Sequence, residues 1–140
     1  MTGRTILVVD DDDEIREITC LALELIGGWT VVSAEGGAIG LELASEHRPS
    51  VVLLDVMMPE MDGPSTCQRL QEDPLTRHIP VILLTAKARV GDSQCWDDLD
   101  IAGVISKPFN PATLSDEIDR LVGEHLGRHR GEHREHRLSA

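Results

Sequence analysis

The sequence predicts an α/β protein with a doubly wound, five-stranded parallel sheet and helices on both faces. Three observations support this fold class. Short runs rich in Val, Ile and Leu have the length and composition of buried parallel strands, and they fall at residues 4–10, 30–34, 51–55, 80–85 and 103–106. Stretches of helical length separate these runs, so right-handed crossovers would cover both faces of the sheet. The 140 residues, 41% of them hydrophobic, are enough for one such domain.

The first three stretches between the strands each carry a helical signal. The first has apolar residues at helical spacing, a candidate N-cap at Asp12 or Asp13, and two consecutive glycines at 27–28 that would end the helix. Apolar residues between 38 and 44 predict a second helix, which closes before Pro49. A third helix is expected at about 64–72, after a loop at 57–63.

The last two helices differ in the strength of their signals. A weaker helix is expected at about 90–98. The final helix has Asn110 as a candidate N-cap and Pro111 at its first position. Its apolar stripe runs through Leu114, Ile118 and Leu121.

The C-terminal segment is rich in histidine and arginine. His125, His129, His133 and His136 recur at near-helical spacing, so they would share one face and could bind a transition metal if the last helix continued. Glycines at 127 and 131 and the high charge density instead favour a solvated extension. Docking of this segment on an acidic partner, or on the acidic body of this chain, is a third interpretation.

The charge of the chain restricts its partners. The formal net charge is −12 at pH 7, which argues against a nucleic-acid backbone or an anionic membrane. No apolar run has the length of a membrane span, and no signal peptide is visible. The three cysteines are an odd number and do not suggest a disulfide framework. We therefore expect a cytoplasmic protein with reduced, mostly buried thiols.

Several strands end in residues that phosphate chemistry uses. Asp10 and Asp11 follow the first run, Asp55 and Thr85 end the third and fourth, and Lys107 follows the fifth. In open α/β sheets ligands bind beyond the carboxyl ends of the strands. Paired carboxylates suit Mg²⁺, a hydroxyl and an ammonium suit phosphoryl oxygens, and a carboxylate can form an aspartyl-phosphate. Taken singly, such residues are ordinary caps and turn residues; their convergence predicts a site.

Four segments together resemble a known family. ILVVDDD, VVLLDVMMPEMDG, IPVILLTAKA and GVISKPF are similar to the receiver domain of bacterial two-component response regulators, over about residues 4–122. The resemblance implies a flavodoxin-like fold with strand order 2-1-3-4-5. It divides the chain into a receiver domain at 1–123 and a charged tail at 124–140, which would be a helix extension or disordered.

The resemblance also implies a magnesium site. Asp11 would bind Mg²⁺ directly, and Asp10 would hold a metal-bound water or assist. Asp55 would share the ion, and the backbone carbonyl of Met57 would complete the protein ligands.

The same resemblance makes Asp55 the phosphoacceptor, with Thr85 and Lys107 binding phosphoryl oxygens. It further implies a cis peptide between Lys107 and Pro108 and a tight turn that requires Gly63. Met57 and Lys87 occupy the positions that tune dephosphorylation in the family by controlling the access of water.

One position departs from the family pattern. Relatives often carry Tyr or Phe three residues before the lysine of the last strand, and this aromatic swings inward as the threonine moves. Here the position is Val104, so an aromatic rotamer switch is not available there. We expect Val104 simply to pack, while movement of Thr85 and backbone shifts near 90–98 remain available.

The resemblance implies a signalling protein rather than an enzyme. A histidine kinase or histidine phosphotransfer protein would supply the phosphoryl group. Only one helix and the tail follow the last strand, which favours a stand-alone receiver. We expect it to be a monomer or a weak phosphorylation-dependent dimer and to signal to a downstream protein target. The surface of 90–98, 103–106 and the last helix is the expected output.

Two alternatives remain. A phosphorylation-independent docking module would have no need of the full residue set. A haloacid-dehalogenase-type phosphohydrolase would need a second aspartate two residues after Asp55, where this chain has Met57.

Overall fold

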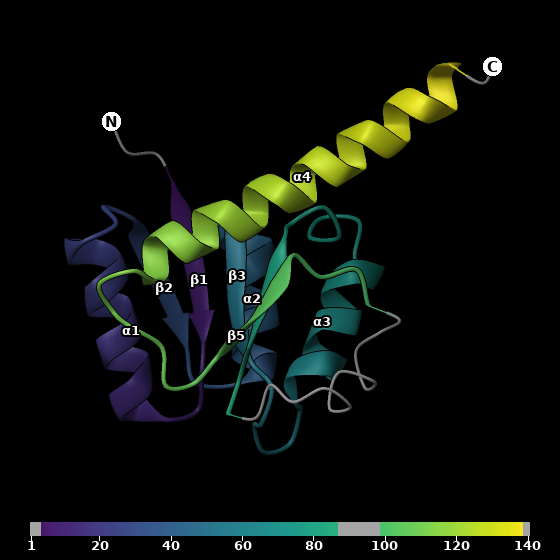
Figure 1. Ribbon diagram of the computed structural model, residues 1–140. Helices are drawn as coiled ribbons and strands as arrows, with labels where there is room; N and C mark the ends of the chain where they lie inside the picture. Colours follow the sequence, from purple (N-terminus) through teal and green to yellow (C-terminus); the bar gives the residue numbers. More distant parts are fainter. Residues whose placement is uncertain (1–3, 87–98, 139–140) are drawn as a thin grey trace.

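The sheet is parallel throughout and has the strand order β2-β1-β3-β4-β5 (Figure 1). The computed structural model describes residues 4–86 and 99–138, with side chains through residue 128. The strands are β1 (Thr5–Val9), β2 (Thr30–Ala34), β3 (Val51–Asp55), β4 (Val81–Thr85) and β5 (Gly103–Ser106). The predicted fold class and strand order are confirmed.

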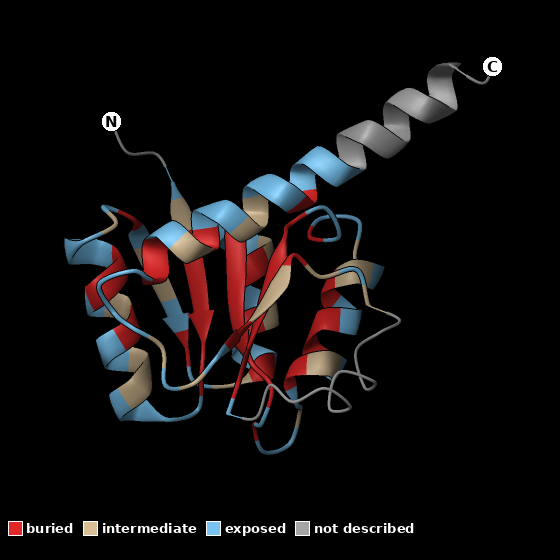
Figure 2. Ribbon diagram, viewed as in Figure 1, coloured by how far each residue is buried: buried red, intermediate tan, exposed pale blue. Residues whose placement is uncertain are grey.

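Helices cover both faces of the sheet because successive strand residues point to opposite sides. In β1, Ile6 and Val8 pack in a cluster with α1 (Asp13–Leu25) and α4 (Leu114–Leu138). Leu7 and Val9 pack on the other face, in a cluster with α2 (Gly37–His47) and α3 (Gly63–Glu72). Figure 2 shows the central strands buried and the outer helix faces exposed. All five residues of β3 and of β4 are buried, as their unbroken apolar runs predict.

The beginnings of α1 and α3 follow from their capping residues. The Asp12 side chain accepts from the backbone N–H of Ile15 at 3.1 Å, and Asp62 accepts from that of Ser65 at 2.8 Å. Each carboxylate satisfies a donor that has no partner within its helix. Gly28, with φ of 70°, ends the turn after α1 in the left-handed conformation that glycine tolerates.

The predicted start of the last helix is wrong by three residues. Residues 111–113 form a turn, and α4 begins at Leu114. The Asn110 side chain accepts from the N–H of Ala112 at 2.9 Å, and its carbonyl accepts from the N–H of Thr113 at 3.1 Å. These bonds span two and three residues rather than four, so Asn110 closes a turn before the helix and does not cap it.

The C-terminal segment continues α4 as a helix through Leu138, which corresponds to the helix extension, one of the two states expected for residues 124–140. In Figure 1, α4 runs past the edge of the sheet and does not fold back on it. An ion pair of 3.3 Å between Arg120 and Glu124 supports the helix at i,i+4 spacing. Of the described helices, none is both long and apolar enough to cross a membrane.

Two further predictions concern the cysteines and the fourth helix. Cys20 is half-buried and Cys67 is buried. Burial raises the pKa of the Cys67 thiol to about 12, which keeps it protonated. The helix expected at 90–98, including Cys95, lies outside the described residues.

Candidate functional site

Parallel pairing brings the predicted site residues to one edge of the sheet. Val9 pairs with Leu54, so Asp10 lies next to Asp55 beyond the ends of β1 and β3. On the other side, Asp55 pairs with Leu84, the residue before Thr85. The backbone N–H of Lys107 donates to the carbonyl of Thr85 at 2.7 Å.

An ammonium group bridges two buried carboxylates at this edge. Lys107 Nζ lies 3.1 Å from Asp10 Oδ2 and 3.1 Å from Asp55 Oδ1. The side chains are 14% exposed for Lys107, 0% for Asp10 and 6% for Asp55. Buried charges without a partner are strongly unfavourable, so the lysine is needed wherever both acids are ionised and no other cation is bound.

The surroundings shift the protonation of both partners. Burial, and then the charge of Asp10, raise the pKa of Asp55 to about 6, although contact with Lys107 acts in the opposite direction. Burial alone would lower the pKa of Lys107, but its contacts with Asp10 and Asp55 outweigh that effect and raise it. Asp55 is therefore mostly a carboxylate at neutral pH and becomes protonated in mild acid.

The donor set fits a magnesium ion. One carboxylate oxygen from each of Asp10, Asp11 and Asp55 lies within 4.8 Å of the other two. Oxygens bound to one octahedral Mg²⁺ are about 3.0 Å apart on adjacent positions and about 4.2 Å apart on opposite ones, so the three carboxylates would draw together around the ion. Among the described buried side-chain atoms, Asp10 Oδ2 has no hydrogen-bond partner, since its contact with Lys107 is an ion pair outside hydrogen-bond geometry. A hard cation would satisfy that oxygen.

The remaining predicted residues lie around this cluster. Thr85 is 5% exposed at the end of β4, and Met57 is 74% exposed in the loop after β3. The peptide between Lys107 and Pro108 is cis, as the resemblance implies. Val104 is partly buried and packs against the core, as expected. Lys87 lies outside the described residues.

Gly63 has a different role from the predicted one. The left-handed residue of the loop is Glu60, with φ of 67°, so the turn does not depend on a glycine at 63. A Cβ on Gly63 would instead lie 2.4 Å from the carbonyl oxygen of Asp55 and 2.8 Å from the Cα of Val56. Gly63 is required because the first turn of α3 meets the backbone at the end of β3.

Arg16 is a site neighbour that sequence reasoning missed. Its guanidinium donates to the backbone carbonyl of Asp10 at 2.8 Å and to the carboxylate of Asp13 at 2.6 Å. The i,i+3 spacing of Asp13 and Arg16 was the available signal. The contact with Asp10 could not be inferred from spacing, because it joins the helix to the end of a strand.

An apolar groove begins at the site and follows α1. Its first part has a volume of about 510 Å³, and Lys107 is its one charged lining residue. The other residues that line it are Ile15, Ile18, Ala86, Pro108, Phe109 and Pro111. A second part of about 250 Å³ continues along the same helix and is lined by Ile18, Leu21, Ala22, Leu25, Ile26 and Pro111. The side chains of this groove include some of the most exposed apolar residues described: Ile18 is 51% and Leu25 80% exposed.

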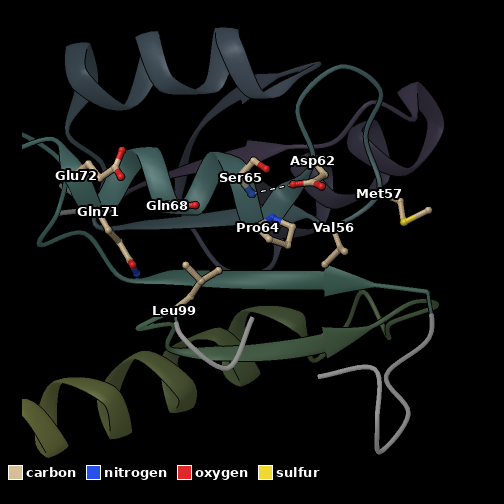
Figure 3. A pocket seen from close by; sticks show the side chains of 9 residues that line it. All are labelled: Val56, Met57, Asp62, Pro64, Ser65, Gln68, Gln71, Glu72 and Leu99. Atoms are coloured by element: carbon tan, nitrogen blue, oxygen red, sulfur yellow. Dashed lines mark hydrogen bonds between the residues drawn. The ribbon is translucent and has the colours of Figure 1, made fainter. Parts of the chain in front are cut away.

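A second groove, of about 660 Å³, lies between α3 and Leu99 (Figure 3). Figure 3 shows Gln68, Gln71 and Glu72 along the helix and Met57 at the far end, with the Asp62–Ser65 cap between them. Neither Asp55 nor Lys107 lines this groove. It adjoins the carboxylate cluster only through Val56 and Met57, which follow Asp55 in the chain.

Comparison with known proteins agrees with the geometry of the site. The model of the response regulator receiver domain matches residues 6–119. The chain is similar to the chemotaxis protein CheY4 of Vibrio cholerae, with a TM-score of 0.79, 29% identity, and coverage of 84% of this chain and 98% of that one. It is also similar to the receiver domain of a sensor histidine kinase from Pseudomonas aeruginosa, solved with a magnesium ion in its active-site cleft, with a TM-score of 0.77, 27% identity, and coverage of 86% and 98%.

A longer relative bears on the expected partners. The chain is 37% identical over 117 residues to the DNA-binding dual master transcriptional regulator RpaA of Synechocystis, a match that covers 84% of this chain and 48% of the relative. The chain thus spans about half the length of such relatives. The expectation that no nucleic acid is a partner, and the expectation of a stand-alone receiver, stay predictions. Because the family model covers most of the chain and strand order, site geometry and solved structures agree with it, the chain belongs to the response regulator receiver domain family.

Proposed function

We propose that this chain is a receiver that takes a phosphoryl group onto Asp55 from the phosphohistidine of a histidine kinase or a histidine phosphotransfer protein. Receiver domains are signalling phosphoacceptors that interact with histidine kinases and bind Mg²⁺ at an acidic cluster. One observation carries the proposal for this chain: Asp55 is a strand-end carboxylate that shares Lys107 with Asp10 and has an oxygen within 4.8 Å of one of Asp11.

Each residue of the cluster has a task in the transfer. A carboxylate oxygen of Asp55 attacks the phosphorus, the phosphorus–nitrogen bond breaks, and the imidazole leaves and takes up a proton. Lys107 would turn from Asp55 toward a phosphoryl oxygen, and the Thr85 hydroxyl would donate to another. A Mg²⁺ ion held by Asp10, Asp11, Asp55 and the neighbouring backbone carbonyl at position 57 would neutralise charge on the phosphoryl group.

Signal output is proposed to pass through protein contacts of a stand-alone receiver in the cytoplasm. Support comes from CheY4, whose chain is covered almost completely by this one, and from the acidic charge of −12, which disfavours direct binding to nucleic acid. With Val104 at the position of the family aromatic, movement of Thr85 is the remaining switch at the site itself.

Incubation with acetyl phosphate and Mg²⁺ tests the acceptor chemistry. We expect the intact mass to rise by one phosphoryl group, and we expect the modification on the peptide that contains Asp55. Removal of divalent ions with a chelator should abolish the adduct, because the three carboxylates then lack the cation that makes room for a phosphoryl anion. The lack of an adduct with acetyl phosphate or phosphoramidate would favour the docking-module alternative. Continuous hydrolysis of a small phosphate ester would favour a phosphohydrolase.

The apolar groove along α1 is the proposed docking surface for the phosphoryl donor. Ile15, Ile18, Ala22 and Leu25 follow one another at spacings of three, four and three residues, which is the pattern of a helix that packs lengthwise on another helix. The groove includes Lys107 at one end. A helical donor lying in it would therefore present its phosphohistidine at the site.

Phosphotransfer to a variant that carries a new charge in the groove tests this docking surface. We expect Leu25→Glu to slow transfer from a phosphorylated histidine kinase by at least about tenfold, because it places a charge on a surface that must be desolvated. The reaction with acetyl phosphate should not change, since a small donor needs no docking. Ile39→Glu is the control on α2, where the residue is 42% exposed and lies outside the groove. Equal rates for Leu25→Glu and the wild type would rule out this surface.

A further inference from the structure

We propose that Arg16 is a positioning residue for the magnesium site, in that it fixes the peptide between the two metal-binding aspartates. This inference rests on the proposed binding of Mg²⁺ by Asp10, Asp11 and Asp55. Arg16 is the fourth residue of α1, and its side chain is only 19% exposed. It contacts none of the three candidate carboxylates, so its effect on the ion would act through the backbone.

The Arg16 guanidinium holds the plane of the peptide that joins Asp10 to Asp11. Its Nη1 donates to the carbonyl oxygen of Asp10 at 2.8 Å. That carbonyl belongs to the same rigid unit as the N–H of Asp11, because a peptide bond is planar. The direction in which the Asp11 side chain leaves the backbone depends on this plane. Asp11 is exposed and is not buried among side chains that could hold it in place.

The other contacts of this turn lead back to the same arginine. Asp10 Oδ1 accepts from the N–H of Asp12 at 2.9 Å, and the N–H of Arg16 donates to the carbonyl of Asp12 at 2.9 Å. Arg16 Nη2 draws the carboxylate of Asp13 to 2.6 Å. Asp13 is thereby held by the arginine, outside the cluster of three carboxylates whose oxygens face one another. The planar fork of arginine can reach both acceptors at once, whereas a lysine can reach one.

Positioning and simple electrostatics predict opposite results for Arg16→Ala. Removing a positive charge near a cation site should strengthen Mg²⁺ binding if charge alone matters. If Arg16 orients the ligands, its loss should raise the dissociation constant for Mg²⁺ by about tenfold, the effect typical of residues that hold metal ligands in place. We expect the second result. Arg16→Lys should fall between Arg16→Ala and the wild type.

Mg²⁺ titration followed by NMR at constant ionic strength measures these constants without any phosphoryl donor. A metal-free readout accompanies it: the amide of Asp12, which donates to Asp10, should exchange its hydrogen faster in both Arg16 variants. Arg120→Ala is the matched control, since it removes an arginine from an exposed ion pair on α4. If Arg16→Ala does not fold, as judged by thermal unfolding, Arg16→Lys carries the test.

The outcomes separate this inference from the proposed function. Unchanged or tighter Mg²⁺ binding by Arg16→Ala, or wild-type binding by Arg16→Lys, would overturn the positioning role while leaving the metal site in place. Failure of the wild type to bind Mg²⁺ would remove the metal from the proposed function and the inference with it. Weaker binding in both variants, together with an unchanged Arg120→Ala, supports the role.

Discussion

The Asp55→Asn variant is expected to accept no phosphoryl group from acetyl phosphate, phosphoramidate or a phosphorylated kinase. An amide oxygen is a poor nucleophile and cannot form the acyl phosphate that a carboxylate forms, so the transfer loses its acceptor. Intact mass measures the result directly. Asp62→Asn is the matched control at the N-cap of α3, because asparagine caps a helix about as well as aspartate. An adduct that persists in Asp55→Asn would assign the acceptor to another residue.

The same variant should be more stable than the wild type at pH 7 in the absence of Mg²⁺. The pKa of Asp55 in the folded chain, about 6, lies above the ordinary value of an aspartate, 3.8. The folded state therefore binds more protons than the unfolded state between about pH 4 and 6, and stability falls as the pH rises through that window. Above that window, the ionised side chain lowers the free energy of unfolding by about 1–3 kcal/mol. Asp55→Asn should restore that amount.

Urea unfolding at several pH values, with a chelator present, measures this effect. The difference in unfolding free energy between Asp55→Asn and the wild type should be largest at pH 7 and shrink as the pH falls toward 4. A difference that does not vary with pH would contradict the raised pKa. Adding Mg²⁺ should narrow the gap at pH 7, because an ion that binds only the folded wild type stabilises it.

The parts of the fold that could be predicted from the sequence are those with local signals. Unbroken apolar runs identify strands that are buried on both faces, as in residues 51–55, and a parallel sheet then brings Asp10 and Asp55 to the same edge. The start of α4 could not be predicted in this way. Asn110 and Pro111 have the residue types of a helix start, but a turn of the same residue types precedes the helix.

Within the site, the sequence could not predict contacts that depend on how one element packs against another. Nothing near Arg16 in the sequence shows that its side chain reaches the carbonyl of Asp10, since that contact depends on how α1 lies against β1. The helical backbone of residues 124–138 could not be decided from the sequence, where a helix extension and a disordered tail both stayed open for a local reason. Glycine is a poor helix former, but the arginine, glutamate and leucine around it are good ones, and the sum over the segment decides.

Gly63 shows the same dependence on tertiary structure, and Gly63→Ala should be among the most destabilising single-methyl changes in the chain. The added Cβ would meet two backbone atoms, the Asp55 carbonyl oxygen at 2.4 Å and the Val56 Cα at 2.8 Å. Neither can move aside as a flexible side chain would. The N–H of Gly63 also donates to the carbonyl of Val56 at 2.9 Å, so separating α3 from β3 breaks that bond.

We therefore expect Gly63→Ala to lower the unfolding free energy by about 2–4 kcal/mol, at or above the usual cost of overpacking. It should also slow phosphorylation by acetyl phosphate, because the displaced backbone is that of Asp55 itself. Gly123→Ala is the matched control. Its Cβ would meet no atom within 4 Å inside α4, so the better helix propensity of alanine should raise stability by about 0.5–1 kcal/mol. Urea unfolding distinguishes the two signs. A Gly63→Ala variant as stable as the wild type would show that the start of α3 can shift away from β3 at no cost, and the rate of phosphorylation would then report whether Asp55 shifts with it.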